Sequence, residues 1–284
     1  MILNTGNILL IGSILLFVSI VVGKAGFRFG VPALLLFLGV GMLFGTDGLG
    51  IEFNNPQTAQ FIGVIALSII LFSGGMDTSA AEIKPVLGQG IVLATVGVMF
   101  TAFLTGYFIY YITNLENSFI TLNFTESLLL ASVMSSTDSA SVFSILRSKR
   151  QGLKENLRPM LELESGSNDP MAYMLTILLI GIIQSGESSL SNTILQFIMQ
   201  MSIGAVSGYL LGRLAVYCIN KLNINQSLYP VLLLAFVFFI FSFTDLVKGN
   251  GYLAVYLAGL VVGNHKVVHK KSLTTFFDGI TWLF

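Results

Sequence analysis

The stretch Leu161-Glu-Leu-Glu-Ser-Gly-Ser-Asn-Asp-Pro170 decides the fold, because it runs directly into the apolar segment 171–180. Carboxylates, hydroxyls and an amide therefore stand inside a run that is long enough to cross a membrane, which takes about 20 mainly apolar residues. Charged groups inside a membrane helix are costly, and they normally face a polar cavity within the protein. The stretch predicts a membrane-spanning helix that carries a functional polar site.

The composition of the whole chain agrees with a membrane protein. Charged residues make up 10% of the 284 residues and hydrophobic residues 54%, whereas a soluble domain has about 25% charged residues. The mean hydropathy is +0.85. Lys and Arg together number 14, as do Asp and Glu, so no basic excess indicates nucleic acid. The one cysteine, Cys218, excludes an internal disulfide framework and a cysteine-based metal cluster.

The hydropathy pattern predicts about nine membrane-spanning helices and the start of a tenth near Phe276. The nine are expected near 8–23, 31–48, 59–76, 86–113, 125–146, 159–184, 192–217, 227–247 and 251–264. Runs of this length favour helices over the strands of a β-barrel, which alternate over about 10 residues. We expect residues 1–284 to form one membrane domain whose later spans are missing.

The basic residues predict an orientation. If the N-terminus lies outside and every span crosses, every Lys and Arg except Lys248 falls in an inside loop. The outside loops then hold the acidic residues Asp47, Glu52, Glu116 and Glu187. Because inside loops of membrane proteins are enriched in Lys and Arg, this asymmetry supports both the orientation and the number of spans.

A second polar stretch, Ser135-Ser-Thr-Asp-Ser-Ala-Ser141, interrupts the predicted span 125–146 and places Asp138 near its middle. Ser and Thr side chains compete for backbone hydrogen bonds and weaken a helix. An unwound segment is tolerated at that depth only where it is buried in protein or lines water, and such segments surround ions in transporters. The alternative is a buried, hydrogen-bonded polar kink.

The spacing of polar residues in the span 159–184 predicts two adjacent polar stripes. Ser165 and Asp169 are four residues apart and share one helical face, and Glu164 and Asn168 do the same beside them. Because this span and the preceding one run in opposite directions, we expect Asp169 and Asp138 to meet at similar depth.

Carboxylates surrounded by hydroxyls suit Na⁺ or K⁺, which prefer oxygen ligands. The expected ligands are Asp169, Asp138, Ser165, Thr137 and the Gly166 carbonyl, which Pro170 leaves without a helical N–H partner. Burial and a nearby like charge both favour the neutral form of a carboxyl group. A proton and a cation therefore compete for one site, and alternating access to it would produce cation/proton antiport. This mechanism requires no cofactor and no resident metal.

Other polar residues are weaker candidates. Asp77, at the end of the predicted span 59–76, is a candidate for lining a cytoplasmic funnel, with a solvated helix end as the alternative. Glu164 supports the polar network or takes part in the site. His265 and His269 have the spacing of a two-histidine metal site, but a solvated cytoplasmic loop is the interpretation that we favour.

Several of these stretches resemble those of the monovalent cation:proton antiporters that are related to sodium/proton exchangers. Thr137-Asp138 resembles the family's Thr-Asp on an unwound core helix, and Glu164-Ser-Gly-Ser-Asn-Asp169 resembles its Glu-Ser-x-x-Asn-Asp signature. The glycine-rich stretches 71–77 and 251–260 also match. Residues 143–149 are most similar to potassium/proton antiporters of the cell-volume-regulation-A type.

The resemblance implies roles that spacing alone does not. Asp169 would exchange its proton for the cation, with Asp138, Thr137 and Ser165 as ligands and with Glu164 and Asn168 as a supporting network. Asn168 before the essential Asp implies electroneutral exchange. The family fold implies a discontinuous core helix, a homodimer, and a second half of an inverted repeat before which we expect this chain to stop. A bacterial inner membrane and a role in pH homeostasis are also implied.

Two other classes of protein remain as alternatives. A cation channel would share the polar lining but would need no competition with protons. An intramembrane aspartyl protease also uses two buried Asp residues, but it needs a Gly-x-Gly-Asp setting that Gly166-Ser-Asn-Asp169 does not match. The sequence therefore favours a transporter over an enzyme.

Overall fold

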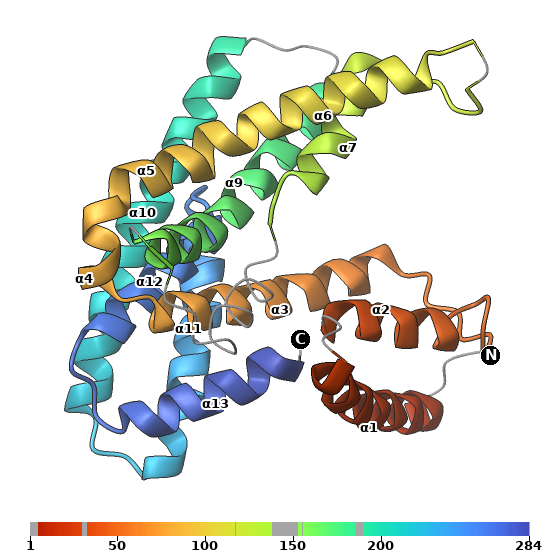
Figure 1. Ribbon diagram of the computed structural model, residues 1–284. Coiled ribbons are helices and arrows are strands. Elements are labelled where there is room, and N and C mark those ends of the chain that lie inside the picture. The colour runs from red at the N-terminus through yellow and green to blue at the C-terminus, as the bar shows by residue number, and fades with distance from the viewer. Residues whose placement is uncertain are drawn as a thin grey trace. The chain divides into compact units, whose positions relative to one another are not determined.

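The computed structural model describes residues 5–29, 33–116, 118–137, 153–154, 156–185 and 190–283 (Figure 1). All regular elements within these residues are helices. The chain divides into two compact units, one up to Val64 and one from Ile65 onward, so the boundary falls inside helix α3 (Pro56–Asp77). The two units are described separately below.

The first unit contains α1 (Thr5–Phe29), α2 (Ala33–Phe44) and the start of α3. A tight turn follows α2, and two glycines make it possible. A Cβ on Gly48 would lie 2.0 Å from the backbone oxygen of Leu43, and Gly50 has a φ of +73°. Both positions suit glycine, which has no Cβ and adopts positive φ without strain.

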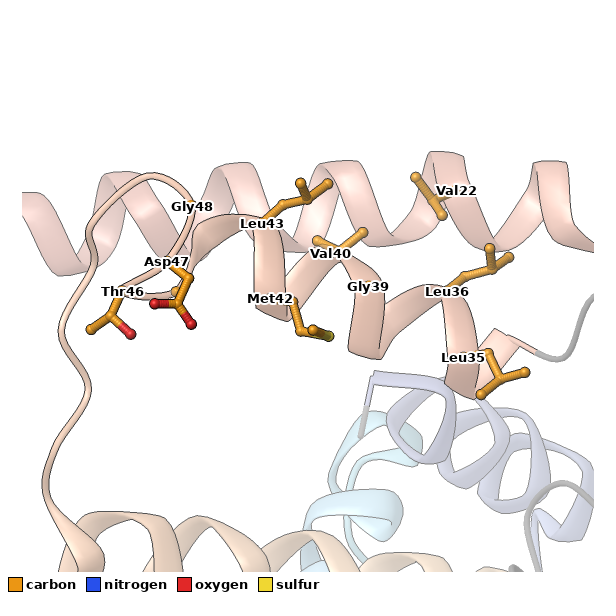
Figure 2. Close-up of a pocket in the computed structure, with 11 residues that line it drawn as sticks. Val22, Leu35, Leu36, Gly39, Val40, Met42, Leu43, Thr46, Asp47 and Gly48 are labelled. Carbon is orange, nitrogen blue, oxygen red and sulfur yellow. The ribbon is translucent and has the colours of Figure 1, made fainter.

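A pocket of about 820 Å³ lies in this first unit, between α1 and α2. Figure 2 shows Leu36, Val40 and Leu43 of α2 pointing toward the helix that carries Val22, with Asp47 at one end. The lining is mainly apolar and includes none of the residues that the sequence predicts for the polar site.

The predicted spans correspond to the observed helices. Among the described residues, five helices are long and apolar enough to cross a membrane: Pro56–Asp77, Ala80–Thr113, Leu157–Gln184, Ile194–Lys221 and Gln226–Leu246. Four shorter apolar helices cover Leu9–Lys24, Leu35–Phe44, Phe124–Met134 and Gly251–Asn264. Each of the predicted segments therefore overlaps one of these helices, and the tenth span expected to start near Phe276 lies in α13 (Lys270–Leu283).

The long helix Ala80–Thr113 is not uniform. It consists of α4 (Ala80–Ile83), a 3₁₀ turn η1 (Lys84–Val86), α5 (Leu87–Val92), a π-helical segment η2 (Leu93–Gly97) and α6 (Val98–Thr113). The 3₁₀ turn contains Pro85, and proline has no N–H to continue the hydrogen-bond ladder of an α-helix. Irregular turns of these kinds are where long helices change their course.

Further helices of the second unit lie between α6 and α13 in the chain. They are α7 (Phe124–Met134), α9 (Leu157–Ser185), α10 (Leu190–Lys221), the short η3 (Gln226–Leu228), α11 (Tyr229–Leu246) and α12 (Gly251–Asn264). Helix α7 packs against α6 and α9, and α12 packs against α10 and α11. Phe72, Leu233, Val255 and Phe277 are fully buried in the core that α3, α11, α12 and α13 share.

Glycines allow α12 to contact two other helices at backbone distance. On the α10 side, a Cβ on Gly208 would lie 2.5 Å from the backbone oxygen of Ala254, and Gly204 and Gly212 are similarly close to α12. On the α3 side, a Cβ on Gly259 would lie 2.2 Å from the backbone oxygen of Phe72. Small residues four apart are how membrane helices approach one another closely. We call these two contacts the α10 seam and the α3 seam.

Asn264 ties the C-terminal end of α12 to the end of α3. Its side-chain nitrogen donates to the backbone oxygen of Thr78 at 2.8 Å, and its side-chain oxygen accepts from the backbone N–H of Ala80 at 2.8 Å. One amide therefore satisfies backbone groups on both sides of the α3–α4 turn, which fixes α12 relative to that turn.

Candidate functional site

The end of α7 is unwound where the sequence predicts a weak helix. Helix α7 begins with a capping box between Asn123 and Glu126 and ends at Met134. Ser135, the first residue after it, donates its hydroxyl to the backbone oxygen of Ser132 at 2.7 Å. Side-chain bonds of this kind compete with the helical ladder, and the residues up to Thr137 continue without helical structure.

Asn168 of α9 is the centre of the polar cluster that joins α9 to this unwound end. The residue is fully buried. Its side-chain nitrogen donates to Thr137 Oγ1 at 2.5 Å and to Glu164 Oε1 at 3.1 Å, and its oxygen accepts from Ser136 Oγ at 3.2 Å. Glu164 and Asn168, which the spacing places on one stripe of the helix, are hydrogen bonded to each other, and the amide also holds two hydroxyls of the unwound segment.

Asp169 and Ser165 lie on the other predicted stripe of α9. Asp169 Oδ1 accepts a hydrogen bond from Ser136 Oγ, and the hydroxyls of Ser165 and Thr137 are 3.1 Å apart. Ser165 is fully buried and Asp169 is half-buried. A carboxylate and several hydroxyl oxygens therefore gather at one place, which is the ligand chemistry that a monovalent cation requires.

Asp138, the remaining predicted ligand, lies outside the described residues. Its meeting with Asp169 stays a prediction. Asp77 is the last residue of α3 and is exposed, and its predicted role at a funnel also stays a prediction.

Ser136 belongs to the cluster, but the sequence reasoning did not single it out. Its hydroxyl lies within reach of Asp169, Asn168 and the Thr137 carbonyl, although one hydroxyl proton serves one acceptor at a time. The signal was present in the sequence, since Ser136 belongs to the hydroxyl run before Asp138.

A second pair of hydroxyls joins α7 to α9 further along. Ser132 Oγ and Thr176 Oγ1 are 3.0 Å apart, and Thr176 also donates to the backbone oxygen of Ala172 at 2.8 Å. Ser132 is fully buried. This pair fixes the helical part of α7 against α9, so that the unwound part begins at a defined place beside Asp169.

An ion pair lies at the start of α9. Arg158 Nε and Glu162 Oε1 are 3.0 Å apart, one helical turn before the cluster. The Glu162 side chain is 10% exposed and that of Arg158 is 44% exposed. The ion pair places the positive charge of the partly exposed Arg158 beside the nearly buried carboxylate of Glu162.

Asn250 attaches α12 to the helix that carries the site. It caps the N-terminus of α12 by accepting from the Leu253 N–H at 3.0 Å, and its side-chain nitrogen donates to the Pro170 oxygen at 3.2 Å. Its backbone N–H donates to the Gln200 oxygen of α10 at 2.9 Å. The sequence analysis missed this residue, because the pattern Gly249-Asn-Gly251 by itself predicts only a turn.

His265 and His269 each contact different residues and do not form one shared site. His265 Nε2 lies 2.7 Å from Arg213 Nη1, and its Nδ1 lies 2.7 Å from the Val261 oxygen. His269 packs against the ring of Tyr229. A guanidinium against a histidine nitrogen disfavours a metal ion at the same nitrogen.

The comparison with protein families decides the identity of the chain. The transmembrane family of sodium/hydrogen exchangers matches residues 12–284. The chain belongs to this family. It is therefore an integral, multi-pass membrane protein.

This exchanger-family chain is similar to curated relatives along nearly its whole length. It is 41% identical to the K⁺/H⁺ antiporter NhaP of Alkalimonas amylolytica, over 98% of this chain and 47% of that protein. It is 36% identical to the K⁺/H⁺ antiporter NhaP2 of Shewanella sp. strain ANA-3, over 99% of this chain and 48% of that protein. The chain thus spans about half the length of these relatives.

A solved structure supports the exchanger fold. The sodium proton antiporter MjNhaP1 from Methanocaldococcus jannaschii aligns with 99% of this chain at a TM-score of 0.82, with 20% sequence identity. The alignment covers 68% of the archaeal chain. The predicted all-helical antiporter fold is therefore confirmed.

Proposed function

We propose that this exchanger-family protein is a secondary antiporter that exchanges K⁺ or Na⁺ for protons. The observation that carries the proposal is the contact between Asp169 and the unwound end of α7. There Ser136 donates to Asp169, while Ser165 and Thr137 bring their hydroxyls within 3.1 Å of each other. The names of the curated relatives, which are K⁺/H⁺ antiporters, favour K⁺ as the first cation to test.

The proposed mechanism is competition at one carboxylate. Asp169 binds either a proton or the cation, with Asp138, Thr137 and Ser165 as the other ligands. Glu164 and Asn168 hold the α9 stripe beside it. Asn168 precedes Asp169 as in the family's Asn-Asp signature, and this resemblance implies that one proton is exchanged for one cation, which makes the proposed exchange electroneutral. Alternating access of the loaded site to the two sides of the membrane then couples the two ions.

The proposal also covers the setting of the protein. Residues 1–284 belong to one transmembrane domain of a homodimer in the bacterial inner membrane, with the N-terminus outside. Asp77, at the end of α3, lines the cytoplasmic entrance. Exchange of this kind serves pH homeostasis. The positive-inside distribution of Lys and Arg is the support for the orientation.

The test is cation-driven proton movement in liposomes. The protein, as its complete reading frame encodes it, is reconstituted with a pH-sensitive dye inside, and K⁺ or Na⁺ is added outside. We expect dequenching that Asp169→Asn reduces to the background rate, because the amide neither releases a proton nor offers a charged ligand.

The matched control is Asp47→Asn, which changes an exposed Asp in the first unit and should leave the rate unchanged. Full exchange by the Asp169→Asn protein would contradict the proposal. A cation current without proton movement would instead indicate a channel.

A further inference from the structure

The hydroxyl of Tyr256 in α12 is buried and has no hydrogen-bond partner among the described residues. The residue is 1% exposed. Buried hydroxyls are nearly always paired with protein groups or with ordered water. The hydroxyls of Ser68 and Thr244 share this property, but Ser and Thr can rotate toward the carbonyl one turn earlier in their own helix. The Tyr256 hydroxyl is too far from its own backbone for that.

Glycines from two other helices make the space that Tyr256 occupies. A Cβ on Gly75 of α3 would lie 2.3 Å from the Tyr256 backbone oxygen. A Cβ on Gly166 of α9 would lie 2.6 Å from Cε2 of the ring and 3.2 Å from its hydroxyl oxygen. Three stretches that the sequence analysis singled out, 71–77, 164–170 and 251–260, therefore meet at this one residue, the first at its backbone and the second at its ring.

Two further hydroxyls face that of Tyr256. Thr78 and Ser167 are close enough to interact with it electrostatically, but neither completes a direct hydrogen bond to it. Thr78 is 2% exposed, and its hydroxyl donates to the Gly74 oxygen at 2.7 Å. The hydrogen of Thr78 is therefore used, whereas its oxygen can still accept.

We propose that one water molecule binds between the hydroxyls of Tyr256, Thr78 and Ser167. Buried water typically makes about three hydrogen bonds. This water accepts from Tyr256, donates to Thr78 and has Ser167 as its third partner.

The water anchors the ring of Tyr256 against Gly166, one residue from Ser165 and three from Asp169. Tyr256 is thus a positioning residue for the turn of α9 that carries the proposed ion site. This second part rests on the proposed antiport, whereas the water site does not.

The water site is tested by radiolytic hydroxyl-radical labelling, because water bound beside a buried side chain is activated in place and oxidises it. The control is Tyr229, which is 5% exposed and whose hydroxyl donates directly to the Leu222 oxygen at 2.8 Å. We expect oxidation of Tyr256 well above that of Tyr229, and its loss in Thr78→Val. Labelling of Tyr256 no stronger than that of Tyr229 would overturn the water site.

Thermal unfolding gives an independent test, because the presence and the absence of the water predict shifts of the unfolding midpoint in opposite directions. If water satisfies the hydroxyl, Tyr256→Phe lowers the unfolding midpoint by about 2–4 °C, and adding Thr78→Val lowers it little further, since both remove the same water. A hydroxyl without any partner would make Tyr256→Phe raise the midpoint, which would overturn the site.

The positioning role is tested by the cation dependence of exchange in liposomes. Tyr256→Phe should raise the half-saturating cation concentration about 3–10-fold with the maximal rate largely kept, the pattern of lost ground-state binding. Tyr229→Phe should change neither. An unchanged cation dependence in Tyr256→Phe would overturn the positioning role. Absence of exchange in the unaltered protein would overturn the proposed function and leave the labelling result standing.

Discussion

Asn168 is the residue on which the polar cluster depends. A side-chain amide offers two donor hydrogens and an acceptor oxygen, and here both kinds of group are engaged, by Glu164 and Thr137 on one side and by Ser136 on the other. A carboxylate at this position would accept but not donate. The amide therefore lets a single residue hold a carboxylate and two hydroxyls in a fully buried place.

We expect Asn168→Ala to destabilise the protein by about 1–3 kcal/mol, because it leaves buried polar partners unsatisfied. Thermal unfolding in detergent measures the change. Asn54→Ala, at an exposed position before α3, should shift stability by no more than about 0.5 kcal/mol. Equal stability of the two variants would show that the cluster does not depend on the amide.

At the residue scale, helical spacing predicted which side chains of α9 share a stripe. Glu164 and Asn168 lie on one stripe and are hydrogen bonded, and Ser165 and Asp169 lie on the adjoining stripe. Ser136 was not predicted, because the hydroxyl that faces α9 depends on where α7 unwinds. That point is set by the back-bonding of Ser135 to Ser132 and by the Ser132–Thr176 pair, which no local pattern reveals.

Among the elements, α12 is the one that contacts two other helices, α3 and α10, through its backbone, and this restricts how it can move relative to them. At the α10 seam the atoms nearest to a Cβ on Gly208 are the backbone oxygen and Cα of Ala254, at 2.5 and 2.7 Å. Backbone atoms cannot turn aside as a flexible side chain would. An added methyl group must therefore push the two helices apart.

We expect Gly208→Ala to destabilise by about 1–3 kcal/mol, the usual cost of overpacking a tight contact. Gly181→Ala in α9 is the matched control, since a Cβ there meets nothing within 4 Å. It should be neutral or stabilise by up to about 1 kcal/mol through helix propensity. Only Gly208→Ala is thus expected to lower stability, and a Gly208→Ala protein as stable as the unaltered one would contradict the close contact at the α10 seam.

At this scale hydropathy predicted helices better than it predicted their beginnings. The segment 251–264 coincides with α12. The predicted span 86–113 in fact begins at Ala80, and the expected restart near Phe276 begins at Lys270. Both early parts are amphipathic: Ile83 is buried beside exposed Glu82 and Lys84, and Leu273 is buried two residues after exposed Lys271. Charged residues on one face lower the average hydropathy and hide such starts.

For the whole molecule, the orientation in the membrane can be tested across a single helix. Lys248 and Lys266 flank α12, and the positive-inside pattern places them on opposite sides. Helix α12 has 14 residues, which gives a length of about 21 Å, less than the hydrocarbon core of about 30 Å. Its crossing is therefore a demanding part of the predicted topology.

We expect cysteines at these two positions, introduced in a Cys218→Ser background, to react from opposite sides with a membrane-impermeant maleimide. Lys248→Cys should be labelled from the outside in spheroplasts, and Lys266→Cys only in inverted vesicles. Labelling of both from the same side would contradict the crossing of α12 and the span count beyond it.

The two seams have a mechanical consequence for the protein. Helices in contact through their backbones cannot slide or roll independently, so we expect α3, α10 and α12 to move as one rigid strut. Asn264 ties α12 to the end of α3, and the backbone N–H of Asn250 ties the start of α12 to Gln200 of α10. In the proposed antiport, the rearrangement that moves the cation would then take place beside this strut rather than within it. The serine-rich end of α7, which contacts α9 through side-chain hydrogen bonds of Ser136 and Thr137, lies outside this strut.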